Sequence, residues 1–190
     1  MFVDDLLLEL FILGISGFLI ACNAYWILIK NKKLDLKGFA VSLVIIGLIT
    51  LMLSLYNEFT WTLPSSYNIL FYDPLTLFSI ILLISGFSIL FNFELIYSGF
   101  IAAFSGIITI IYGLIGFLYG MTNSPIAFFL LYLFFGLAGI LGYKISNYFE
   151  NTKRTNKTIA YVFIILTIVA SLIAFVIGLI GLPIHLAHAP

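Results

Sequence analysis

Residues 75–120 read LTLFSIILLISGFSILFNFELIYSGFIAAFSGIITIIYGLIGFLYG, a nearly continuous apolar run. As one helix the run would be about 70 Å long at 1.5 Å per residue, more than twice the hydrocarbon thickness of a bilayer. It must therefore turn, and Asn92 with Glu94 is its only strongly polar position. We predict two membrane-spanning helices here, 75–92 and 95–120. The alternative is that part of the run is a re-entrant or surface helix.

The rest of the chain contains four more segments of similar length and apolar character, at about 6–29, 38–56, 126–146 and 159–182. The chain is 63% hydrophobic and 8% charged, with a mean hydropathy of +1.23. A soluble domain would carry roughly a quarter of its residues as charges. We therefore predict one all-α domain over residues 1–190, a polytopic integral membrane protein with a compact bundle of six transmembrane helices. A net charge of zero argues against nucleic acid as a partner.

The basic residues predict how the bundle is oriented. They form two clusters separated by four of the predicted spans, so both clusters return to the same side of the membrane: Lys30, Lys32, Lys33 and Lys37, then Lys144, Lys153, Arg154 and Lys157. The positive-inside rule places that side in the cytoplasm. We expect a multi-pass plasma membrane protein with cytoplasmic loops 30–37 and 147–158. The loop 57–74 and both termini are then external (N-out, C-out).

Small residues predict how the helices pack. In the fourth span they recur at alternating steps of three and four, which keeps them on one helix face: Gly99, Ala102, Gly106, Thr109, Gly113, Gly116 and Gly120. Small faces allow close van der Waals contact between helices in lipid. We expect the fourth span to be central in the bundle. The alternatives are that the glycines of this face line a narrow pathway, or mediate self-association or contact with other membrane protein subunits.

The predicted span interiors contain no ionisable side chain. Glu9 and Glu94 lie at span ends, where we expect them to reach water or lipid headgroups. This pattern lowers the expectation of an ion-coupled transporter. The single cysteine, Cys22, lies in an apolar run, and we expect it to be a small buried packing residue.

The predicted external face carries the only candidates for a metal site. If Pro183 opens a helical turn, His185 and His188 lie at i and i+3 on one face, where Glu58 or Asp73 could help them bind Cu or Zn. The alternative is a polar tail at the interface, and no other cofactor is predicted. In the loop 57–74, Trp and Tyr side chains favour the headgroup region. Pro74 suits the first turn of the third span.

The segments Trp61-Thr-Leu-Pro64, Tyr67-Asn68 and Asp73-Pro74 resemble the most distinctive part of a family of mostly archaeal, multi-spanning membrane proteins, the domain of unknown function 981. The six-span layout and the end containing His and Pro are similar too. The resemblance implies a topology and a prokaryotic plasma membrane, but no activity. Tyr72 stands where the family pattern has a Gly before the Asp-Pro pair, which argues against a tight turn there.

Three functions follow from these observations as hypotheses. The leading one is a non-enzymatic membrane protein that acts as a scaffold or as a subunit of a larger membrane or cell-envelope complex. The second is a channel or carrier for a small neutral solute, lipid or quinone. The third is a membrane redox or metal protein with a site on its outer face.

Overall fold

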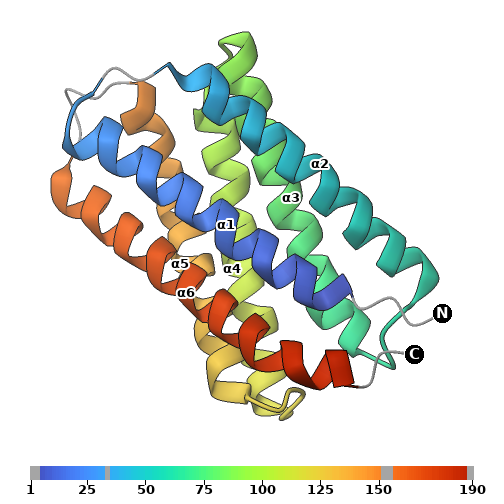
Figure 1. The fold of residues 1–190 in the computed structure, drawn as a ribbon. Coiled ribbons are helices and arrows are strands. Elements are labelled where there is room, and N and C mark those ends of the chain that lie inside the picture. The colour runs from blue at the N-terminus through green and yellow to red at the C-terminus, as the bar shows by residue number, and fades with distance from the viewer. Residues whose placement is uncertain (1–4, 33–34, 151–155, 188–190) are drawn as a thin grey trace.

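The computed structural model describes residues 5–32, 35–150 and 156–187. Six long helices run up and down in this part of the chain, which contains no strand (Figure 1). Each is long and apolar enough to cross a membrane, which confirms the predicted all-α, six-span membrane protein. The elements are α1 (Asp5–Ala24) with a π-helical turn, η1 (Tyr25–Ile29), then α2 (Leu36–Thr60), α3 (Tyr67–Phe91), α4 (Ile96–Leu118), α5 (Pro125–Glu150) and α6 (Lys157–Ala187).

The long apolar run turns where its polar residues predict. Helix α3 ends at Asn92, which adopts a left-handed conformation (φ 56°) and donates its backbone N–H to the Ser88 carbonyl. Asn tolerates this conformation better than most residues, so it suits a helix C-cap. Glu94 is exposed in the short connection that follows.

The connection between α2 and α3 differs from the expected loop 57–74. Helix α2 continues to Thr60 and α3 already begins at Tyr67, so only residues 61–66 link them. Pro74 therefore lies inside α3 and not in its first turn. The early part of α3 is helical because it has a face to bury: Asn68, Leu70 and Tyr72 are all nearly inaccessible.

The described basic residues gather toward one end of the bundle, the upper end in Figure 1. The end of η1 and the start of α2 lie at the same end as the last turns of α5 and the start of α6, and the described basic residues are in or near these helix ends: Lys30, Lys32, Lys37, Lys144 and Lys157. We call this the lysine end. The opposite end carries the connections 61–66 and 119–124, close to Glu58 and Asp73, and we call it the carboxylate end.

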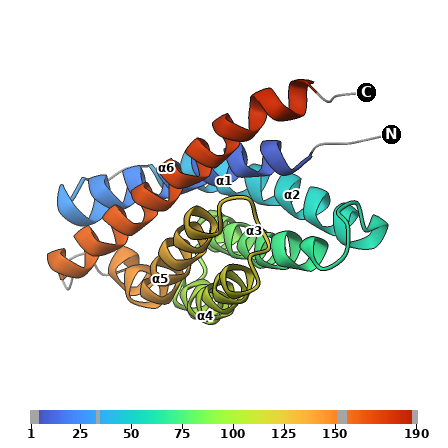
Figure 2. The same cartoon turned by 90° about the horizontal axis from the view of Figure 1, so that it is seen from below.

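The helices pack mainly as three pairs, α4 with α5, α2 with α3, and α1 with α6. The small-residue face of α4 lies against α5, where a Cβ on Gly106 would be 2.4 Å from the Gly136 carbonyl oxygen. The prediction that α4 is central is wrong, because α4 lies at the edge of the bundle (Figure 2). Its glycines pack mainly against α5, and Gly116 also meets Leu70 of α3. The opposite face of α4 bears large exposed side chains such as Phe100 and Phe104.

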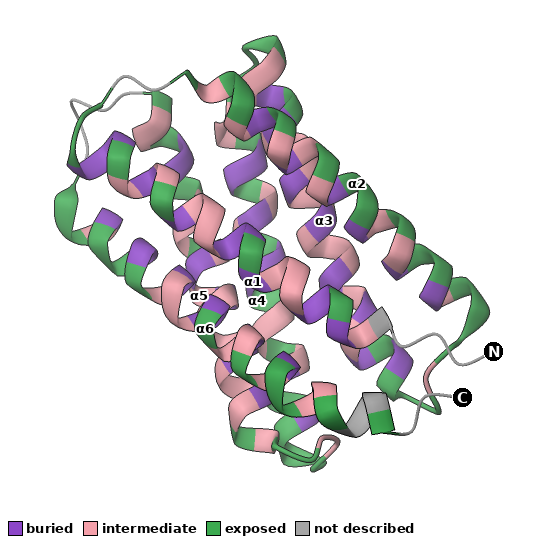
Figure 3. Ribbon diagram, viewed as in Figure 1, coloured by how far each residue is buried: buried purple, intermediate pink, exposed green. Residues whose placement is uncertain are grey.

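Exposed positions occur along every helix (Figure 3), and many of them carry large hydrophobic side chains. Large exposed hydrophobic side chains would be costly in water, but a lipid environment accepts them. Cys22 belongs to this surface and is exposed, so the prediction that it is buried is wrong. A thiol behaves as a small hydrophobic group, which makes a lipid-facing position acceptable.

Candidate functional site

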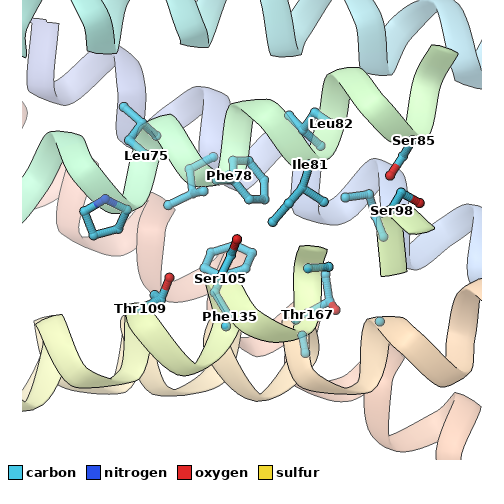
Figure 4. A pocket seen from close by; sticks show the side chains of 18 of the residues that line it. Leu75, Phe78, Ile81, Leu82, Ser85, Ser98, Ser105, Thr109, Phe135 and Thr167 are labelled. Carbon is cyan, nitrogen blue, oxygen red and sulfur yellow. The ribbon is translucent and has the colours of Figure 1, made fainter. Parts of the chain in front are cut away.

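A cavity of about 220 Å³ lies between the α2–α3 pair and the rest of the bundle. All six helices contribute to its wall. Figure 4 shows Phe78 and Ile81 of α3 across the space from Ser105 and Thr109 of α4. The cavity exists because α3 meets the other helices chiefly through α4, whereas its closest partner, α2, lies on the outside.

The cavity is long and almost entirely apolar. Its wall on α3 runs from Phe71 to Ile89, which corresponds to about 27 Å at a rise of about 1.5 Å per residue. Several hydroxyl groups occur in the wall, but Ser98, Ser146 and Thr167 each donate to a backbone carbonyl of their own helix or its preceding residue. Such bonds occupy the hydroxyl proton, so these positions offer little polarity to the cavity.

Glu9 of α1 lines the cavity near the carboxylate end. It is only 3% exposed, so the expectation that it reaches water or headgroups is wrong. Its Oε1 accepts a hydrogen bond of 3.4 Å from Nδ2 of Asn57, which is fully buried near the end of α2. A buried carboxylate needs such a donor, because an isolated one is costly in an apolar environment.

Asn57 and Asn68 together hold the connection 61–66. Asn68 donates to the Asn57 carbonyl oxygen at 3.1 Å and accepts from the Leu63 backbone N–H at 3.1 Å. Thr62 donates its hydroxyl to the Asn57 side-chain oxygen at 2.8 Å. We call Asn57, Thr62, Leu63 and Asn68 the asparagine clasp. It connects the loop directly to the buried Glu9.

A second polar contact depends on Pro74. A proline inside a helix has no N–H to donate to the carbonyl four residues earlier, which is that of Leu70. The hydroxyl of Tyr132 on α5 donates to this carbonyl oxygen at 2.9 Å. The bond satisfies a backbone acceptor that would otherwise be unpaired in the bundle. It also joins α3 to α5 across the wall of the cavity.

Glu58 and Asp73 come together at the carboxylate end, on α2 and α3. Their carboxyl groups lie close enough to interact electrostatically, and the hydroxyl of Tyr112 on α4 donates to the Asp73 carboxylate. Two ionised carboxylates so close would repel each other, which favours a proton on one of the two. This cluster links α2, α3 and α4 beside the asparagine clasp.

The predicted metal ligands are thus placed only in part. The structure brings Glu58 and Asp73 together, but His188 and the side chain of His185 lie outside what it describes. Among the described residues, no three His, Cys, Asp or Glu side chains form a group that could hold a metal ion.

Sequence reasoning missed Asn57, Tyr112 and Tyr132 as structural partners. None of them belongs to a motif, and each acts on a residue far away along the chain. Asn68, Asp73 and Pro74 were singled out as part of a distinctive pattern, and the structure gives each a defined contact.

A family model described as "Protein of unknown function (DUF981)" matches residues 1–188. No curated protein and no solved structure matches the chain.

Proposed function

We propose that the activity of this chain, which belongs to the DUF981 family of proteins of unknown function, resides in its intramembrane cavity. The proposed function is non-enzymatic: the bundle binds an elongated apolar ligand from the bilayer, such as a lipid chain, and holds or carries it between its helices. The single observation that carries the proposal is the long apolar cavity between the α2–α3 pair and the other helices.

The size of the cavity supports a bound molecule over empty space. An apolar cavity of about 150 Å³ stays dry and accepts a benzene molecule, and a single water needs only about 10–15 Å³. The cavity of about 220 Å³ has room for a larger apolar group. Its apolar wall favours a hydrocarbon chain over ordered water, because a water needs two to four polar partners.

The helix arrangement also supports entry from the bilayer. The α2–α3 pair meets the rest of the bundle through α1–α2 and α3–α4 contacts, which are less extensive than the contacts within each pair. A small separation of the pair from the bundle would open the cavity to lipid. Such movements of packed helices relative to one another are a common form of gating.

The test is to fill the cavity and measure what the protein retains. Ser105 is 4% exposed and points into the cavity (Figure 4), so Ser105→Phe should occupy part of it. Ile107→Phe is the matched control, because Ile107 lies on the same helix and is 48% exposed. We expect native mass spectrometry and lipid extraction to find a bound chain in the wild type and in Ile107→Phe, and much less in Ser105→Phe. Equal retention in all three, or none in any, would contradict the proposal.

A scaffold or subunit role is the second candidate. The exposed face of α4 favours it, because Phe100 and Phe104 form an aromatic pair with ring centroids 4.9 Å apart, and Tyr143 of α5 lies beside them. The small-residue face of α4 is occupied by α5, so self-association or contact with other subunits would use this aromatic face instead. In mild detergent, Phe100→Ala with Phe104→Ala should release a partner or dissociate an oligomer, whereas a wild-type protein that is a solitary monomer would exclude this role.

The distribution of the lysines also supports an orientation of the bundle in the membrane. We propose that the lysine end faces the cytoplasm of a prokaryotic, in the family mostly archaeal, plasma membrane. Lys32 lies with its Nζ 4.2 Å from the centre of the Trp26 ring, and Lys30 lies 5.7 Å from that of Tyr25. Aromatic and basic side chains paired in this way are typical of the headgroup region.

A further inference from the structure

Among the residues that the structure describes, Glu9 is the only acidic side chain in the wall of the cavity, and this wall contains no Lys, Arg or His. The described lysines lie toward the opposite end of the bundle; Lys30 is about 30 Å from Glu9 at the rise of about 1.5 Å per residue along α1 and η1. The described wall therefore has a carboxyl group near one end and no basic side chain.

The surroundings of Glu9 favour its role as a hydrogen-bond acceptor. The amide of Asn57 donates to it, and Asn57 is itself held by the asparagine clasp. Tyr132, the other strongly polar group near this end of the wall, donates its hydroxyl to the Leu70 carbonyl. A ligand that reaches this end thus meets an acceptor, and its best partner is a donor that also carries positive charge.

We propose that the ligand is a single-chain amphiphile with a positively charged ammonium head group, which Glu9 binds, while its chain follows α3 and α4 toward the lysine end. This inference rests on the proposed function and specifies its ligand class. An anionic head would meet a like charge, and a carbonyl head such as that of a quinone would place one acceptor against another.

The chemistry has two possible sources, a free long-chain amine and the ethanolamine head of a phospholipid. Both present an ammonium group on an apolar chain. The cavity volume of about 220 Å³ suits one chain better than two, so a phospholipid would leave its second chain in the bilayer.

The test compares three probes with the same chain and different heads: hexadecylammonium, hexadecanol and hexadecanoate. Binding to the purified full-length protein in mild detergent is measured by native mass spectrometry and by displacement of a fluorescent fatty amine. We expect the wild type to prefer the ammonium probe to the alcohol by at least about tenfold, because charge-assisted hydrogen bonds are the stronger ones. Hexadecanoate should bind most weakly.

Glu9→Gln is the diagnostic variant, because its side-chain oxygen can still accept from Asn57 and should preserve the fold. We expect it to bind the ammonium probe and the alcohol within about twofold of each other, since it has lost only the charge. Glu94→Gln is the control, because Glu94 is exposed outside the cavity. It should keep the wild-type preference, which separates binding at Glu9 from general attraction of a cation to an acidic protein.

The outcomes separate the two proposals. If the wild type binds the alcohol and shows no preference for the ammonium probe, or if Glu9→Gln keeps that preference, the head-group inference is wrong and the proposed function stands. If no probe binds the wild type, the proposed function itself fails. In a further arm, displacement of hexadecylammonium by phosphatidylethanolamine in the wild type identifies the lipid head as the source, and no displacement identifies the free amine. Either result retains the ammonium chemistry.

Discussion

The hydroxyl of Tyr132 donates to the backbone oxygen of Leu70 at 2.9 Å, and this is the carbonyl that Pro74 cannot pair within its own helix. Tyr132→Phe should lower the free energy of unfolding by about 1 kcal/mol, because it leaves a buried acceptor without its donor. In a Pro74→Ala background the cost should be smaller, since the alanine restores a backbone N–H that can donate to the Leu70 carbonyl. A double-mutant cycle in thermal unfolding measures the difference. Equal costs in both backgrounds would show that Pro74 does not create the need for the tyrosine.

The contact between Gly106 and Gly136 gives a second prediction. Gly106→Ala places a methyl group 2.4 Å from a backbone oxygen of α5, and we expect a loss of about 1–3 kcal/mol because backbone cannot yield as a side chain can. Gly38→Ala is the matched control, because no atom lies within 4 Å of the added carbon. It should leave the melting temperature unchanged or raise it slightly, as alanine is the better helix former. Similar melting temperatures for the two variants would contradict this packing.

The asparagine clasp predicts where local opening begins when it is weakened. Asn68→Ala removes the acceptor of the Leu63 N–H and the donor to the Asn57 carbonyl. We expect faster amide hydrogen exchange in residues 61–66 and proteolytic cleavage there, because the loop then lacks its anchors. Thr60→Ala serves as the control, since the Thr60 hydroxyl donates to a carbonyl of its own helix. Unchanged exchange of the Leu63 amide would refute the role assigned to Asn68.

The pair of Glu58 and Asp73 predicts that replacing Glu58 by its amide costs less stability than removing the tyrosine hydroxyl that donates to Asp73. The amide of Glu58→Gln can donate to Asp73 and removes a like charge, so the free energy of unfolding at neutral pH should be no more than about 1 kcal/mol below that of the wild type. Tyr112→Phe removes the donor to Asp73 and should be less stable than Glu58→Gln. Thermal unfolding of the two variants in one detergent decides this. A larger loss in Glu58→Gln would mean that the pair does not share a proton.

The proposed orientation is tested by cysteine labelling in a Cys22→Ser background. Ser66→Cys lies at the carboxylate end and Lys32→Cys at the lysine end, and both positions are exposed. With a membrane-impermeant maleimide, Ser66→Cys should react in intact cells and Lys32→Cys only after lysis. The opposite result would invert the orientation and place the basic loops outside.

The sequence was sufficient for the features that depend on local composition. Span number follows from apolar length, and the turn at Asn92 from the one polar point in a run too long for a single helix. Lys30 and Lys157 lie at the same end because an even number of spans separates them. Each of these properties can be read from neighbouring residues without knowing which helices touch.

The candidate site depends on contacts that neighbouring residues do not reveal. Glu9 lies only one turn into its span, which suggested access to water, yet Asn57 of α2 covers it. Pro74 suggested a helix start, yet it lies inside α3, where Tyr132 of α5 donates to the Leu70 carbonyl that Pro74 leaves without a backbone donor. The cavity depends on which helices pack against each other as pairs. Small-residue spacing shows that a face packs closely, but it does not name the neighbour.

The pairing of α1 with α6 has a consequence for how the protein is made. A Cβ on Gly17 would lie 2.1 Å from the Ser171 hydroxyl, so this face of α1 is shaped to fit α6 closely. Helix α6 begins at Lys157, long after α1 ends at Ala24. At a synthesis rate of about 5–20 residues per second, the delay is on the order of ten seconds. During that time the glycine face of α1 contacts lipid or an insertion factor in the membrane. It can pack against α6 only after the last span has been synthesised.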